Sequence, residues 1–114
     1  MLSDGGRAAL VEIEAAIADI RSFTQAVTKD RYLADREKQM AVAMALVIIG
    51  EAANRLSAEA RAKAPELDWA AIVSLRNRIA HGYGSVDHRL VWSIVESEID
   101  ALEGAIARLM GEGA

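Results

Sequence analysis

Residues 40–53 would be apolar almost all the way round if they formed a helix, and this feature constrains the fold more than any other. A helix without a polar face has to be buried on more than one side. In a chain of 114 residues, that means either a central position in a helical bundle or a place in a subunit interface. We therefore expect this helix to lie at the centre of the fold, and we expect a homodimer.

The remaining sequence predicts three further helices and no β-strand. Apolar residues recur at steps of three and four positions over residues 7–27, 69–81 and 88–109, as in helices with one buried face. The central helix itself is expected over residues 36–60. A single proline leaves long helices uninterrupted. The sequence thus predicts one all-α domain over residues 1–114, built as an antiparallel, up-and-down four-helix bundle.

The connections between these helices carry their own signals. The segment after the first helix is polar apart from Tyr32 and Leu33, which are expected to fold back onto the core. Gly82 can adopt the left-handed conformation that ends the third helix. The third and fourth helices each follow a good N-terminal cap, Asp68 and Asp87 respectively.

Charge and cysteine content narrow the functions open to the chain. The formal net charge is -4 and the sequence pI is about 5.1, whereas sequence-independent nucleic-acid binders carry a basic surface. A protein of this kind that handles RNA needs a local basic patch. The absence of cysteine excludes a disulfide scaffold, thiolate metal sites and a cysteine nucleophile.

The first residues of the chain and its longest apolar run indicate where in the cell the protein is expected. Residues 1–6 lack the basic segment and apolar stretch of a signal peptide. The longest apolar run, residues 40–50, is shorter than the ~20 residues that span a bilayer. We expect a cytoplasmic protein that does not enter the membrane, with residues 110–114 fraying at the end of the last helix.

The densest group of chemically capable side chains lies near the end of the third predicted helix. In a continuous helix, Arg76 and His81 point roughly 140° apart. They converge only if the helix ends near His81, so that this residue swings back, or if they meet across two subunits. The group has five members: Arg76, Asn77, Arg78, His81 and Tyr83.

An arginine and a histidine suit the cleavage of an RNA phosphodiester, which carries its own nucleophile in the 2′-hydroxyl. His81 would act as general acid or base, and Arg76 would neutralise the phosphate with its planar fork of donors. Asn77 would orient the scissile group or the imidazole, and Arg78 would contact the RNA backbone. Glu51 intrudes into the apolar helix, either at an exposed edge or interface position or with a partner such as an arginine. It is expected to support the site. This chemistry calls for no metal and no cofactor, but two copies of the histidine in one cleft would best supply both acid and base.

Each of these residues also has an ordinary structural explanation. A histidine at a helix end is most often a cap-like residue, exposed arginines are solvated charges, and Tyr83 would pack under a turn. Trp69 and Trp92 are expected in the core, and His88 in the first turn of the fourth helix. On this interpretation the chain is a non-catalytic helical dimer that binds a partner protein or a nucleotide, or a purely structural dimer.

The cluster and its flanks resemble a known family. Residues 76–83 read Arg-Asn-x-x-Ala-His-Gly-Tyr, which resembles the R-x-x-x-x-H-x-Y motif of the HepT-like ribonuclease toxins in the HEPN superfamily. The resemblance extends over roughly residues 10–107. Its flanking segments are Ile49-Gly50-Glu51-Ala52-Ala53 with Leu56-Ser57, Pro65-Glu66 with Trp69, and Val86-Asp87 with Val91-Trp92.

The resemblance implies a helical homodimer with a composite active site between the subunits. It implies metal-independent endoribonuclease activity, with Arg76 and His81 as the catalytic pair and Asn77 in support. It also implies a partner, a minimal nucleotidyltransferase antitoxin that can transfer AMP to Tyr83. A phosphate-bearing adduct two residues from His81 would block and repel an RNA phosphate.

Overall fold

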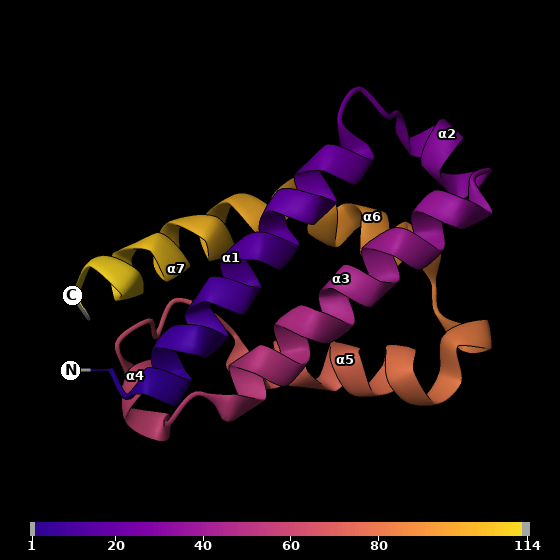
Figure 1. The fold of residues 1–114 in the computed structure, drawn as a ribbon. Coiled ribbons are helices and arrows are strands. Elements are labelled where there is room, and N and C mark those ends of the chain that lie inside the picture. Colours follow the sequence, from indigo (N-terminus) through magenta and orange to yellow (C-terminus); the bar gives the residue numbers. More distant parts are fainter. Residues whose placement is uncertain (1, 113–114) are drawn as a thin grey trace.

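The computed structural model describes residues 2–112, and this part of the chain is helical with no β-strand. Figure 1 shows the arrangement of the helices. Their order along the chain is α1 (Asp4–Thr24), α2 (Lys29–Leu33), α3 (Arg36–Arg55), α4 (Ala58–Ala62), α5 (Trp69–Gly82), the 3-10 turn η1 (Tyr83–Ser85), α6 (His88–Ser97) and α7 (Ile99–Glu112).

The central helix of the fold is α3. It packs against α1 on one side and α5 on the other, while α7 covers the far side of α1 (Figure 1). Eight residues of α3 are buried, and together they cover about half of its circumference: Val42, Ala43, Ala45, Leu46, Ile49, Gly50, Ala52 and Ala53. The prediction of a helix buried on more than one side is therefore confirmed.

One strip of α3 remains uncovered in the single chain. Met40, Met44 and Ile48 follow one another at four-residue steps and are 48%, 59% and 37% exposed. Residues at this spacing lie on the same face of a helix. We call these three residues the α3 strip.

Two short helices lie where the sequence analysis expected connections. The Thr28 side chain accepts a hydrogen bond from the backbone N–H of Arg31 at the start of α2, and the Ser57 side chain accepts one from Ala60 at the start of α4. Hydroxyl caps of this kind initiate helices of any length. Tyr32 in α2 is fully buried and Leu33 packs against the core, as predicted.

The fourth predicted helix is broken, which corrects the expectation of one continuous helix. It consists of α6 and α7, which meet at Glu98. The Ser97 hydroxyl donates a hydrogen bond of 2.7 Å to the carbonyl of Ser93, a contact that bends helices. Arg21 of α1 binds Asp100 and Glu103 and so holds α7 in its new direction. The apolar periodicity of the sequence continues through the break, so the sequence pattern does not reveal where the helix is interrupted.

The predicted ends of the first two long helices also need correction. The first helix starts at Asp4, where the Ser3 hydroxyl accepts a hydrogen bond from the N–H of Gly6, and it ends at Thr24. It cannot continue to residue 27 because Ala26 has a φ of 57°, in the left-handed region. The second helix ends at Arg55, and the expected extension to residue 60 belongs to α4.

Among the remaining predictions about helix ends, the two aspartate caps are confirmed and the fraying of residues 110–112 is not. Both aspartate caps are present: Asp68 accepts from the N–H of Ala71, and Asp87 accepts from the N–H groups of Arg89 and Leu90. Residues 110–112, expected to fray, are helical, while residues 113 and 114 lie outside the described part of the chain. Within residues 2–112, no helix combines the length and hydropathy needed to cross a bilayer.

Tyr32 gives the fold a pH dependence in the alkaline range. Burial, with a smaller effect from the nearby Tyr83, raises the pKa of Tyr32 to about 12 from its ordinary value near 10. The unfolded chain ionises this phenol first, so the stabilising effect is complete below about pH 10 and is lost as the pH rises through about 12. We expect the free energy of unfolding, measured by denaturant titration, to fall over this interval more steeply in the native chain than in Tyr32→Phe. Equal slopes in the two proteins would contradict this prediction.

Candidate active site

The candidate site is built around an unusually close crossing of α3 and α5. Gly50 of α3 faces Arg76 of α5, and a Cβ atom placed on Gly50 would lie 2.2 Å from the Cβ of Arg76 and 3.2 Å from the backbone oxygen of Ile72. Such a short separation is possible only because glycine has no side chain. The crossing fixes the stem of Arg76 against α3.

The guanidinium of Arg76 is held by two neighbours. Its Nη2 donates a hydrogen bond of 2.7 Å to Oε1 of Glu51, and its Nη1 donates one of 2.9 Å to Oδ1 of Asn77. The side chain of Arg76 is 28% exposed, and its Nε is buried without a hydrogen-bond partner. An arginine partner, one of the two settings expected for Glu51, is confirmed, and that partner is Arg76.

This group opens into a cleft of about 700 Å³ between α1, α3 and α5. Small residues of α1, Ala15 and Ala16, leave the space that the cleft occupies. The cleft has an apolar part, to which Ile48 and Val73 also contribute. Its polar lining consists of Glu12, Asp19, Glu51, Asn54, Arg55, Arg76 and Asn77. It is large enough for part of a ligand the size of a nucleotide.

Sequence reasoning missed four of these lining residues: Glu12, Asp19, Asn54 and Arg55. The four lie on α1 and α3, away from the motif, and only the packing of α1 on α3 brings them together. Glu12 forms an ion pair with Arg55 across the two helices. Complementary charges on two predicted helices are too common a pattern to have revealed this pair.

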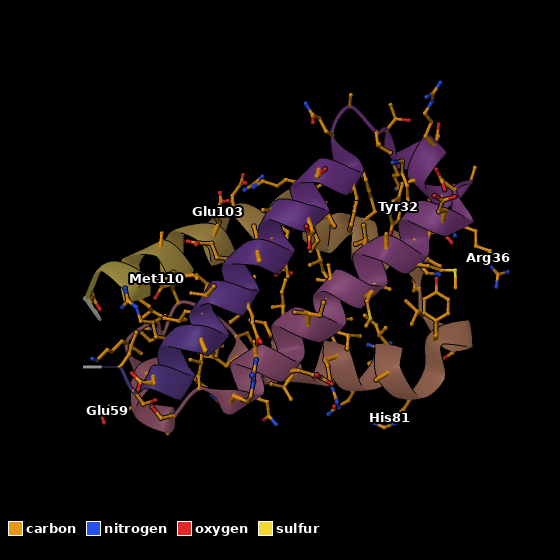
Figure 2. All side chains as sticks on the ribbon, in the orientation of Figure 1. Tyr32, Arg36, Glu59, His81, Glu103 and Met110 are labelled. Atoms are coloured by element: carbon orange, nitrogen blue, oxygen red, sulfur yellow. The ribbon has the colours of Figure 1, made fainter. Side chains whose placement is uncertain are left out.

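His81 does not share the cleft with Arg76 in the single chain. It lies in the last turn of α5, is exposed, and is not among the residues that line the cleft. Figure 2 shows its side chain pointing away from α3. Of the two routes by which Arg76 and His81 could meet, a local swing of His81 is therefore not used here.

The end of α5 explains this placement and corrects the expectation for Gly82. Its φ is -160°, which is extended backbone, not the left-handed conformation. The Ser85 hydroxyl donates a hydrogen bond of 2.8 Å to the carbonyl of Gly82, and Tyr83 continues in the right-handed region. Because α5 runs directly into η1, His81 keeps its helical direction.

Arg78 and Tyr83 lie elsewhere. Arg78 is exposed and lines a second groove, of about 580 Å³, between α5 and the α6–α7 pair. Tyr83 turns inward: its hydroxyl is buried without a hydrogen-bond partner, and its ring packs edge-on against His88 at 5.6 Å between centroids. The structure thus brings Glu51, Arg76 and Asn77 together, but places the other three predicted site residues outside the cleft.

The aromatic residues expected in the core are there. Trp92 is buried and packs against Tyr32, with 5.0 Å between the ring centroids. Trp69 packs against the core, and its indole N–H donates to the carbonyls of Arg61 and Ala64. Among the described residues, no group of three or more acidic or histidine side chains is placed to hold a metal ion.

Comparison with known proteins agrees with the motif and its setting. The family model described as "Ribonuclease HepT-like" matches residues 13–109. The protein named "Probable ribonuclease HepT" of Thermococcus cleftensis is 34% identical over 100 residues, covering 88% of this chain and 91% of the relative. "Putative RNase MJ0127" of Methanocaldococcus jannaschii is 33% identical over 110 residues, covering 93% and 91%.

No solved structure matches the chain significantly. The family match nevertheless spans the crossing of α3 and α5, every cleft-lining residue except Glu12, and the whole 76–83 motif. The chain belongs to the HepT-like ribonuclease family.

Proposed function

We propose that the chain is a metal-independent endoribonuclease and the toxin of a two-component toxin–antitoxin pair. The observation that carries this proposal is the position of Arg76. Its guanidinium is fixed by Glu51 and Asn77, and its partly exposed side chain lines the cleft. A pre-oriented, planar donor of this kind suits the capture of a phosphate.

The proposed reaction uses the nucleophile of RNA itself. The 2′-oxygen attacks the adjacent phosphorus and gives its proton to a base, while the bond from phosphorus to the 5′-oxygen breaks and the leaving oxygen takes a proton from an acid. The products are a 2′,3′-cyclic phosphate and a 5′-hydroxyl. His81 serves in the proton transfers, and Arg76 stabilises the charge that develops on the phosphorane oxygens. Asn77 and Glu51 position Arg76.

A homodimer brings Arg76 of one subunit next to His81 of the other, which a single chain does not do. Arg76 lines the cleft and His81 points elsewhere, so a composite site needs a second copy. The α3 strip supports this assembly, because a row of three large exposed apolar side chains is the kind of surface that a subunit interface covers. Ile48 belongs both to the strip and to the cleft lining, so a dimer formed there brings two clefts close together.

The α3 strip gives a direct test of the dimer. Met44 is 59% exposed, so Met44→Glu should leave the helical fold intact in a single chain. At a dimer interface the same change buries an unpaired charge, which is strongly unfavourable. We expect the native chain to sediment as a dimer, and Met44→Glu to sediment as a monomer with unchanged helical circular dichroism and little RNA cleavage. A variant that stays dimeric, at equal concentration, would exclude this face. Val11→Glu, a matched change at an exposed apolar residue outside the strip, is the control.

We also propose Tyr83 as the residue through which a minimal nucleotidyltransferase antitoxin acts, by transfer of AMP to its hydroxyl. In the described conformation this hydroxyl is buried. The transfer therefore requires η1 to open first, and the adduct then prevents η1 from closing. Few bonds oppose this opening, since η1 is held mainly by the hydrogen bond from the N–H of Val86 to Tyr83 and by the Ser85 hydroxyl.

Incubation of the purified chain with matched RNA and DNA strands in the presence of a chelator tests the activity. The proposal predicts that the RNA is cut, leaving cyclic phosphate ends, and that the DNA stays intact because it lacks the 2′-hydroxyl. RNA that remains whole at an excess of the chain would favour the alternative. On that alternative, the chain is a non-catalytic helical dimer that binds the nucleotidyltransferase or a nucleotide.

A further inference from the structure

One acidic side chain of the cleft has no counter-charge. Glu12 pairs with Arg55, and Glu51 pairs with Arg76. Asp19 lines the same cleft, yet no hydrogen bond or ion pair joins its side chain to another residue within residues 2–112. The cleft therefore presents one free carboxylate beside a fixed guanidinium.

Asp19 of α1 lines the same cleft as Arg76 of α5, and so does Ile48 of α3. On α1, Asp19 lies seven residues, about 10 Å, beyond Glu12, which pairs with Arg55 of α3. A phosphate on Arg76 would thus place a neighbouring nucleoside in the cleft that the Asp19 carboxylate also lines.

Charge decides which part of an RNA strand this end of the cleft can accept. A free carboxylate repels a phosphate, so the backbone cannot continue past Asp19 at close range. It attracts N–H donors instead. Single-stranded RNA offers such donors on the Watson–Crick edges of its splayed bases.

Guanine fits a carboxylate best among the four bases. Its Watson–Crick edge carries two adjacent donors, N1–H and the N2 amino group, which match the two carboxylate oxygens. Adenine and cytosine place one amino group beside an acceptor, and uracil places one N–H between two acceptors. We propose that Asp19 reads a guanine next to the scissile phosphate; this proposal rests on the ribonuclease function proposed above.

The test is the sequence preference of cleavage. An RNA randomised at its central positions is cut by the native chain, and the new ends are sequenced. We expect guanine to be enriched roughly tenfold at one position that flanks the cut, since a bidentate contact discriminates by about that factor. Asp19→Asn, which keeps the shape but places a donor where an acceptor was needed, should reduce the enrichment to within about twofold. The matched control is Glu14→Gln, which removes the same charge from an exposed position of α1 outside the cleft.

Two results would overturn the assignment: a native chain that cuts beside all four bases alike, or an Asp19→Asn variant that retains the guanine preference. If the native chain cuts no RNA, the ribonuclease proposal fails, and binding decides the guanine proposal separately. Uncleavable 2′-O-methyl oligouridine, with and without a single guanosine, is titrated against the labelled native chain and Asp19→Asn. Tighter binding of the guanosine-containing strand by the native chain alone supports the reading role of Asp19. Equal binding of the two strands excludes it.

Discussion

Replacing Arg76 with alanine should slow RNA cleavage by roughly a hundredfold or more, because a single donor aimed at developing negative charge contributes about this much to catalysis. The fold should survive. The Glu51 side of the lost ion pair is 54% exposed and the Arg76 side 28%, and partly exposed pairs add only modestly to stability. The measurement is the initial rate of cleavage of a labelled RNA, with circular dichroism and thermal unfolding run on the same samples.

Two companion variants sharpen this result. Arg76→Lys keeps the charge but loses the planar fork, so it should recover only part of the activity. Arg31→Ala removes the same charge from an exposed position of α2 that is not part of the cleft, and it should cleave at the native rate. If Arg76→Ala cleaved as fast as the native chain, Arg76 would have no catalytic role.

Gly50→Ala should destabilise the fold more than the same change at any other glycine of residues 2–112. The new Cβ would lie 2.2 Å from the Cβ and 2.8 Å from the Cγ of Arg76, so α3 and α5 have to move apart. We expect a loss of about 2–3 kcal/mol in the free energy of unfolding, at the upper end for an overpacked core. This corresponds to a fall in the melting temperature of roughly 10 °C. Because the shift carries Arg76 away from Glu51, RNA cleavage should fall as well.

Gly104→Ala is the matched control for this prediction. It makes the same chemical change within α7, where a Cβ atom would meet nothing within 4 Å. Alanine favours a helix over glycine, so this variant should be more stable than the native chain by up to about 1 kcal/mol. Equal effects of the two substitutions would show that the crossing at Gly50 is not as close as described.

The sequence was informative where one residue type had a single physical solution. A long apolar helix in a short chain had to be central, and α3 is. A carboxylate in that helix was expected at an exposed edge or beside an arginine, and Glu51 is both exposed and paired with Arg76. The aspartates that precede the third and fourth helices are the caps that their side chains favour.

It was uninformative where the outcome depended on competition between contacts distant in the sequence. At the break between α6 and α7, the Ser97 hydroxyl bonds the Ser93 carbonyl, and Arg21, 79 residues before Asp100, binds α7. The apolar periodicity of the sequence continues through the break. The direction of His81 follows from its place in the last turn of α5, which ends at Gly82 and continues directly into η1. The inward turn of Tyr83 likewise depends on its packing against His88.

The central claim is that Arg76 and His81 act together across two subunits. Arg76→Ala and His81→Ala chains are mixed under conditions in which subunits exchange, and native mass spectrometry verifies the mixed dimers. The account predicts that each variant alone is nearly inactive, and that the mixture recovers cleavage well above both because a mixed dimer brings one intact arginine to one intact histidine. A verified mixed dimer that cleaves no faster than its parents would contradict it.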